Sequence, residues 1–192
     1  MLKELEDYAK EHNVPIMLLD GIDYLCNYIK ENNIKSILEV GSAIGYSAIR
    51  MALVADDIYI TTIERDEVRY REAIKNIEKF HLENRIQVIY GDAMEVDVTG
   101  EYDLIFIDAS KGHSIDFFNR FEPNLTSDGT IVTDNLSFHG LVEDDSLVVT
   151  KNQRGLVRKI KNFIEFLDNH TEFVTEYVNV GDKISITRRK SC

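Results

Sequence analysis

Two carboxylates and one amide follow two apolar runs of this 192-residue chain. Asp108 ends the run Y-D-L-I-F-I-D, with Lys111 three residues later, and Asp134 and Asn135 end the run G-T-I-V-T-D-N. If both runs are strands of one parallel sheet, these side chains meet at the edge where doubly wound folds bind ligands. Their oxygens are hard ligands that suit magnesium, manganese or calcium rather than zinc. We therefore predict a divalent-metal site, with magnesium as its ion; the alternative is that each Asp merely caps a loop.

A glycine-rich turn earlier in the chain is a candidate cofactor site. The sequence E-V-G-S-A-I-G-Y-S, from Glu39 to Ser47, lies where an apolar run gives way to a helical pattern. Glycine in such a turn lets a ligand approach the backbone closely. The G-x-x-x-G spacing differs from the G-x-G-x-x-G of dinucleotide enzymes, and Glu39 would repel a pyrophosphate but suit the cationic end of S-adenosylmethionine. The alternative is a glycine turn with a purely structural role.

Two further segments fit the same cofactor. Glu64 ends the run I-Y-I-T-T-I-E, where its carboxylate could accept hydrogen bonds from both ribose hydroxyls. Gly91, Asp92 and Ala93 follow the next apolar run, where an adenine edge would lie. Together with Gly41, these positions predict a nucleoside-containing cofactor across the carboxyl ends of the strands.

The elements that must position these residues alternate along the chain. We expect strands over 36–41, 58–64, 86–92, 102–108 and 129–135, and helices over 43–55, 67–82 and 113–121. Near-continuous Val, Ile and Leu runs are typical of strands covered on both faces, and their alternation with helices predicts a doubly wound α/β fold. After a helical pattern that follows Arg154, two alternating runs meet at Gly181-Asp182 and predict an antiparallel hairpin. We expect a single domain over 1–192, with residues 1–30 as an N-terminal helical cap.

Composition narrows the class of protein. The hydrophobic share of 44% and the charged share of 29% are ordinary for a globular protein. No run is long and apolar enough to span a membrane, and the two cysteines form no disulfide framework, so we expect a cytoplasmic protein without a membrane partner. The net charge of −12 argues against nucleic acid, yet its distribution is uneven, since residues 151–192 carry +4 and residues 1–150 carry −16.

The motifs occur in an order that resembles the metal-dependent O-methyltransferase family, which includes catechol and caffeoyl-CoA O-methyltransferases. The resemblance runs from about Val14 to the C-terminus and rests on I-L-E-V-G-S-A-I-G-Y-S-A-I-R-M-A, Glu64, Y-G-D-A, F-I-D-A-S-K and V-T-D-N. It implies a Rossmann-like sheet of seven strands in the order 3-2-1-4-5-7-6, with strand 7 antiparallel. It also implies a homodimer that uses S-adenosylmethionine as its methyl donor.

The resemblance also implies roles for single residues. Asp108, Asp134 and Asn135 would bind the metal, and Lys111 would lie beside the acceptor oxygen. A metal-bound hydroxyl loses its proton more easily, so Lys111 and Asp108 are the predicted catalytic residues, with Lys111 taking the proton. The residues predicted to contact the cofactor are Met17, Glu39, Gly41, Ser47, Glu64, Gly91, Asp92, Ala93 and Asp108.

The acceptor is suggested by a basic segment. Residues 151–161 contain five basic side chains, and a helical projection places Arg154, Arg158 and Lys161 near one face, with Lys151 at the start. Such a ridge could hold RNA phosphates. Through H-N-V-P-I-M and K-N-Q-R-G-L-V-R-K-I, the chain resembles the bacterial branch that methylates 5-hydroxyuridine at the tRNA wobble position. We therefore expect tRNA as the acceptor; the acidic net charge favours the alternative, a small catechol-like or phenolic molecule.

The sequence departs from small-molecule members of the family at two points, and it fits two other function classes less well. F-I-D-A-S-K-G-H differs from the F-I-D-A-D-K…Y of small-molecule members, and the chain begins late, without most of an N-terminal helix. A non-catalytic module that binds cofactor or metal is disfavoured, because it has no reason to keep Asp108, Lys111, Asp134 and Asn135 together. A dehydrogenase is disfavoured by the absent third glycine and by Glu39.

Overall fold

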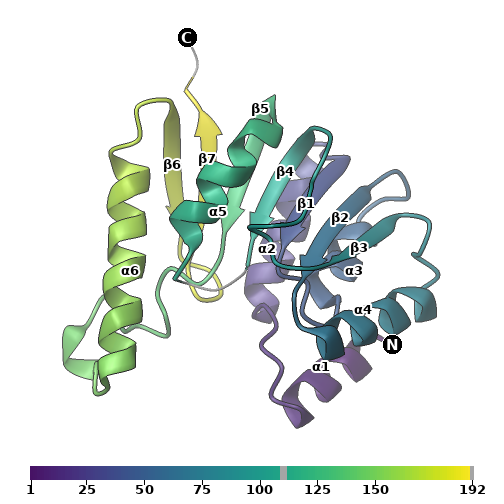
Figure 1. The fold of residues 1–192 in the computed structure, drawn as a ribbon, viewed down its shortest axis with the longest axis horizontal. Coiled ribbons are helices and arrows are strands. Elements are labelled where there is room, and N and C mark those ends of the chain that lie inside the picture. Colours follow the sequence, from purple (N-terminus) through teal and green to yellow (C-terminus); the bar gives the residue numbers. More distant parts are fainter. Residues whose placement is uncertain (109–111, 191–192) are drawn as a thin grey trace.

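A seven-stranded sheet in the order β3-β2-β1-β4-β5-β7-β6 forms the centre of the computed structural model, which describes residues 1–108 and 112–190 (Figure 1). The strands are β1 (Ser36–Val40), β2 (Tyr59–Glu64), β3 (Ile86–Tyr90), β4 (Tyr102–Ile107), β5 (Leu125–Thr133), β6 (Phe173–Val178) and β7 (Ile184–Arg189). Strands β1 to β5 pair in parallel, and β7 runs antiparallel to both of its neighbours. This order and this polarity confirm the predicted Rossmann-like topology.

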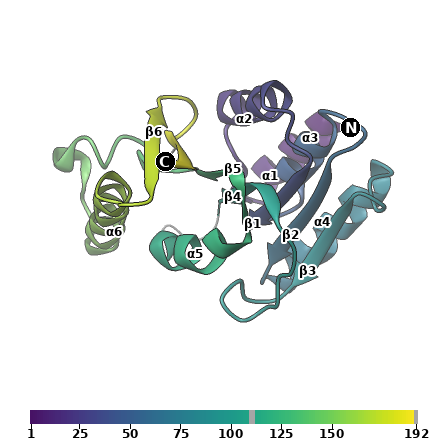
Figure 2. The same ribbon diagram turned by 90° about the horizontal axis from the view of Figure 1, so that it is seen from above.

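Helices cover both faces of the sheet (Figure 2). They are α1 (Leu2–Glu11), α2 (Leu19–Glu31), α3 (Tyr46–Ala52), α4 (Glu67–Lys79), α5 (Ser114–Phe121) and α6 (Lys151–Asp168), with short 3-10 turns at Glu122–Asn124 and Asp145–Leu147. The first four share one apolar cluster with the sheet, while α5 and α6 pack on the opposite face. Within the described residues, none of these helices is long and apolar enough to cross a membrane.

Residues 104–107 of strand β4 form a continuously apolar run for a structural reason. Successive side chains of a strand point to opposite faces, so each face needs its own apolar set. Leu104 and Phe106 lie in the cluster with α2 and α3, whereas Ile105 and Ile107 lie in the cluster with α5 and α6. Because both faces of this part of the strand are buried, the run L-I-F-I has no polar alternation.

Three elements begin three or more residues away from their expected starts. Helix α3 begins at Tyr46 rather than residue 43, because Ala43 and Gly45 have left-handed φ values of 45° and 82° that interrupt a helix. Strand β5 begins four residues earlier than expected, at Leu125. Helix α6 begins at Lys151, where Thr150 and Gln153 form a capping box.

The C-terminal hairpin confirms the expected antiparallel pair but has a longer connection than a two-residue turn. Five residues, 179–183, join β6 to β7. Gly181 has φ of 56° and Lys183 has φ of 63°, and both lie in the left-handed region. This loop lies at the same end of the sheet as the carboxyl ends of β1 to β5 (Figure 1).

Asp103 aligns the two central strands at their opposite end. Its Oδ2 accepts hydrogen bonds from the backbone N–H groups of Lys35 (2.9 Å) and Ser36 (3.0 Å). The Ser36 hydroxyl accepts in turn from the backbone N–H of Asp103 at 3.0 Å. These bonds join the first residues of β1 and β4, whose last residues carry the predicted site.

Replacing this carboxylate should destabilise the protein. We expect Asp103→Ala to lower the free energy of unfolding by about 1–3 kcal/mol, because two partly buried donors lose a charged acceptor. Urea denaturation followed by circular dichroism measures the change. The matched control is Asp128→Ala, an exposed aspartate on β5, which should stay within about 0.5 kcal/mol of the parent. Equal effects of the two substitutions would show that Asp103 does not align the strands.

Candidate active site

The residues that follow the parallel strands are held in line by backbone hydrogen bonds. The N–H of Asp108 donates to the carbonyl of Val40 at 3.1 Å, and the N–H of Asp134 donates to the carbonyl of Ile107 at 3.3 Å. The ladder between β1, β4 and β5 therefore continues for one residue beyond the strands. Both aspartates lie at one edge of the sheet, as the sequence predicts.

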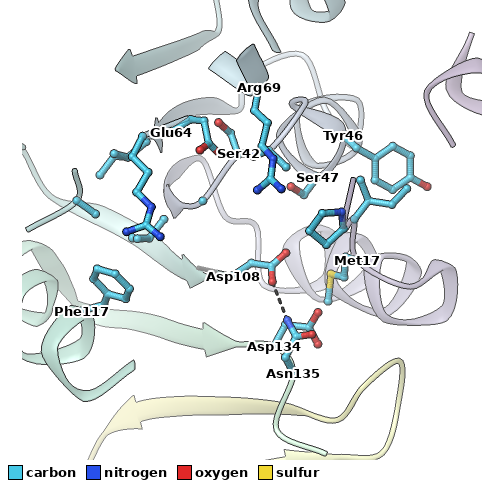
Figure 3. Close-up of a pocket in the computed structure, with 18 of the residues that line it drawn as sticks. Met17, Ser42, Tyr46, Ser47, Glu64, Arg69, Asp108, Phe117, Asp134 and Asn135 are labelled. Carbon is cyan, nitrogen blue, oxygen red and sulfur yellow. Dashed lines mark hydrogen bonds between the residues drawn. The ribbon is translucent and has the colours of Figure 1, made fainter. Parts of the chain in front are cut away.

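A cavity of about 580 Å³ opens at this edge (Figure 3). The predicted site residues that line it are Met17, Gly41, Ser47, Glu64, Gly91, Asp92, Ala93, Asp108, Asp134 and Asn135. Glu39 is not in the lining. Lys111 lies outside the described residues. The basic residues Lys151, Arg154, Arg158 and Lys161 lie on α6, away from this lining.

Glu64 ties the glycine-rich turn to the start of α4. Its Oε2 accepts from the backbone N–H of Ala43 and its Oε1 from that of Asp66, both at 2.8 Å. The side chain is only 6% exposed, yet it lines the cavity. Each carboxylate oxygen can accept more than one hydrogen bond, so Glu64 keeps capacity for hydroxyl groups of a ligand.

Asp108, Asp134 and Asn135 point toward one another in the cavity (Figure 3). The amide Nδ2 of Asn135 donates to Oδ1 of Asp108 at 2.8 Å, and Asp134 is buried. In the part of the chain that the structure describes, no three His, Cys, Asp or Glu side chains form a metal-binding group. A cation here would therefore use Asn135 as its third ligand, and the amide would have to turn its oxygen toward the two carboxylates.

Glu39 occupies a different place from the one expected. Its side chain is fully buried, where Oε1 accepts from the hydroxyl of Ser47 and Oε2 from that of Thr62. Loss of hydration raises the pKa of Glu39 from 4.5 to about 7; the two hydroxyl donors oppose this shift, and the charge of Glu64 adds to it. Glu39 does not line the cavity itself but accepts a hydrogen bond from Ser47, which does, and its predicted contact with the cofactor stays a prediction.

Asp182 is a site residue that the sequence analysis missed. It lines the cavity from the loop between β6 and β7 and is only 5% exposed. Its Oδ1 accepts from the backbone N–H of His139 at 2.6 Å, and its carbonyl accepts from that of Ser137 at 2.9 Å. The hairpin thereby holds the segment that follows Asn135, and no local pattern around residue 182 indicates this long-range contact.

The histidines near the two acidic motifs separate in space. His139, with φ of 58°, lines the cavity. His113 is not in the lining; its Nδ1 lies 3.1 Å from Oδ2 of Asp116 on α5. Two arginines that the sequence analysis did not consider, Arg65 and Arg69, also line the cavity.

Comparison with known proteins bears on the whole chain. Residues 1–190 match a family model described as O-methyltransferase. A caffeoyl-CoA O-methyltransferase from Stellaria longipes is 29% identical over 202 residues, which cover 98% of this chain and 83% of that protein.

Solved structures agree with the fold. A Staphylococcus aureus protein, provisionally described as a caffeoyl-CoA O-methyltransferase, superposes with a TM-score of 0.93 at 37% identity. The match covers 98% of this chain and 92% of that one. An O-methyltransferase from Bacillus cereus, solved in complex with SAH, has a TM-score of 0.82 at 23% identity, over 98% of this chain and 90% of that one. The second likeness concerns the fold alone.

The raised pKa of Glu39 predicts a pH-dependent stability. Between pH 4.5 and about 7 the folded protein keeps a proton that the unfolded chain has lost, so this group makes stability fall as pH rises through that window. Glu39→Gln mimics the protonated form and removes this contribution. We expect the variant to gain stability relative to the parent from pH 5 to pH 8, by an amount on the order of 3 kcal/mol.

Urea denaturation at several pH values, without cofactor, measures the difference between the two curves. Glu101→Gln, an exposed glutamate in the loop before β4, is the control and should give a curve parallel to that of the parent. If the curve of Glu39→Gln were also parallel, Glu39 would be ionised in the fold throughout this range.

Proposed function

The chain belongs to the O-methyltransferase family, and we propose that it transfers the methyl group of S-adenosylmethionine to an acceptor hydroxyl held at a divalent-metal site. The observation that carries this proposal is that one cavity joins two chemically different halves. The glycine-rich turn and Glu64 line one half, and the cluster of Asp108, Asp134 and Asn135 lines the other. A methyl donor and an oxygen acceptor placed in the two halves would face each other.

The cofactor half offers a partner for each part of S-adenosylmethionine. Glu64 has acceptor capacity for the ribose hydroxyls, and Ala93 lies at the carboxyl end of β3, where we place the adenine. Gly41 lets the ligand approach the backbone, since its φ of 101° is one that side chains disfavour. Met17, which is buried and comes from the segment before α2, would cover the ligand.

The acceptor half has an oxygen donor set that suits a divalent cation. Asp108 and Asp134 supply two carboxylates in a largely buried place, where their mutual repulsion favours a cation. Such an ion, when bound, lowers the pKa of an acceptor hydroxyl and orients it. An acceptor with two adjacent oxygens would fit best. Lys111 remains the predicted proton acceptor.

Alignment of the methyl donor with the acceptor oxygen would supply much of the remaining rate acceleration. Transfer from a sulfonium is an in-line displacement, and holding two reactants in line can contribute roughly 7–11 kcal/mol. Both halves of the cavity are attached to the same sheet edge through the backbone bonds of Asp108 and Asp134. The sulfonium loses its charge during transfer, so the protein needs no oxyanion hole.

The metal proposal predicts that Asp134→Asn weakens Mn²⁺ binding. The substitution keeps the shape of the side chain but removes one negative charge, so we expect at least about a tenfold loss of affinity and a similar loss of methyl transfer. Isothermal titration with Mn²⁺ in the presence of S-adenosylhomocysteine measures binding, and EDTA should abolish transfer by the parent. Asp128→Asn, on the exposed part of β5, is the control. Full activity of the parent in EDTA would contradict metal dependence.

For the acceptor, we propose 5-hydroxyuridine in the tRNA anticodon, which offers a hydroxyl beside a carbonyl. Helix α6 begins at the same end of the sheet as the cavity (Figure 1). Arg154 and Arg158 are exposed on it and, within the described residues, form no ion pair, so both are available to phosphates. The Nζ of Lys159 lies 2.9 Å from the position that a Cβ at Gly112 would take. Helix α6 therefore places a positive charge beside a residue that follows Asp108 by four positions in the chain.

A small catechol-like acceptor is the second candidate. The net charge of −12 disfavours a polyanion, and the relatives named above as caffeoyl-CoA O-methyltransferases are named for a small-molecule reaction. A homodimer in the cytoplasm, as predicted from the family resemblance and the composition, is compatible with either acceptor.

Charge reversal on α6 separates the two candidates. We expect Arg154→Glu/Arg158→Glu to lower kcat/KM for tRNA bearing 5-hydroxyuridine by at least about tenfold, and to reduce the salt dependence of binding by about two charges. Methylation of a catechol probe should change by less than about twofold, because neither arginine lines the cavity. The control is Arg71→Glu/Lys75→Glu on α4, whose side chains are both 71% exposed.

A genetic measurement tests the same assignment directly. Mass spectrometry of tRNA nucleosides from a strain lacking this chain should show loss of 5-methoxyuridine-type modification. Unchanged modification would remove the tRNA assignment and leave the small acceptor as the function.

A further inference from the structure

The charges of the cavity lining match only part of S-adenosylmethionine. Five carboxylates line the cavity, from Glu64, Asp92, Asp108, Asp134 and Asp182. They suit the sulfonium and the ammonium group of the cofactor. The carboxylate of the cofactor's methionine part is repelled by the same lining, so a cationic side chain inside the cavity would be a favourable partner for it.

Arg69 is a cation in a suitable place. It is half-buried, and Figure 3 shows its guanidinium extending into the cavity toward Ser47, on the side of Glu64 that also holds Tyr46 and Met17. Arg65, the other arginine in the lining, lies 3.9 Å from Asp92 and is already paired. Among the described residues Arg69 has no ion-pair partner.

The base of this side chain is fixed relative to the ribose site. The backbone N–H of Arg69 donates to Oδ1 of Asp66, the N-cap of α4, at 2.9 Å. The N–H of Asp66 donates in turn to Glu64, the proposed ribose acceptor. One short segment, residues 64–69, therefore carries both Glu64 and Arg69, and the capping of α4 sets the spacing of their backbones.

A second polar group in the same part of the cavity lacks a protein partner. The Ser42 hydroxyl is buried, with the side chain only 2% exposed, and makes no hydrogen bond to any residue that the structure describes. Ser42 lines the cavity beside Glu64 (Figure 3). Buried hydroxyls are almost always hydrogen-bonded, and a polar ligand in the cavity would supply the partner that this one lacks.

We propose that Arg69 binds the carboxylate of the methionine part of S-adenosylmethionine, which rests on the proposed use of that cofactor. A guanidinium can hold a carboxylate through two parallel hydrogen bonds. Adenine would lie toward Arg65 and Asp92, ribose at Glu64, and the amino-acid part under Arg69. This order directs the sulfonium between them toward the cluster of Asp108 and Asp134.

Two ligands that differ only in the carboxylate test the proposal. Isothermal titration would compare S-adenosylhomocysteine with its decarboxylated analogue, S-adenosyl-3-thiopropylamine, on the parent and on Arg69→Gln. We expect Arg69→Gln to weaken S-adenosylhomocysteine by about 10- to 100-fold and to change the analogue by less than about threefold. Arg69→Lys, which keeps the charge, should recover part of the lost affinity.

The matched control is Arg71→Gln, because Arg71 lies on the same helix but is 71% exposed and paired with Glu67. It should bind both ligands like the parent, and the melting temperature of each variant without ligand shows whether α4 remains folded. Equal weakening of both ligands by Arg69→Gln would overturn the carboxylate contact while leaving the cofactor proposal in place. A parent that binds neither ligand would overturn both.

Discussion

Parallel strands that end together are the constraint on which this site depends. The backbone bonds from Asp108 to Val40 and from Asp134 to Ile107 extend the ladder past the last strand residues. Two carboxylates that are 26 positions apart in the chain are thereby fixed side by side. Burial of β4 on both faces keeps this edge rigid, because its neighbouring strands and both layers of helices hold it. A cation site made of three side chains tolerates little movement, so a rigid edge suits it.

The cavity combines this edge with a second group of buried acids whose roles differ. Glu64 remains at the surface of the cavity and joins the glycine-rich turn to α4 through two backbone donors. Glu39 lies beneath it, held by Ser47 and Thr62, with its pKa raised by burial. A cationic ligand bound above would favour the ionised form of Glu39, so cofactor binding and the protonation of this residue should be coupled. Arg69 is the complement to this acidity, because the cofactor also carries one negative group.

The uneven charge of the chain has a structural counterpart. Helix α6 carries five basic and two acidic side chains, and its buried face packs Ile160, Phe163 and Leu167 against the sheet. The acidic residues that line the cavity lie at the same end of the sheet where this helix begins. In the proposed reaction, α6 would attract a polyanionic acceptor at long range. A cation inside the cavity would then bind the hydroxyl of the same acceptor at close range.

The sequence by itself determined the alternating α/β class and ten residues of the cavity lining, because continuous apolar runs, a glycine turn and acidic strand ends are local patterns. The order of the strands was predicted only through the family resemblance. The place of Glu39 required tertiary structure, since strand periodicity does not reveal that Ser47 and Thr62 enclose its carboxylate. The places of Asp182 and Arg69 in the cavity lining were likewise determined only by the tertiary structure. Asp182 reaches the site through a hairpin more than 40 residues after Asn135 in the chain, and the backbone of Arg69 is held near Glu64 by the N-cap of α4, Asp66. Contacts between segments distant in sequence depend on how the elements pack, and local patterns carry no record of that packing.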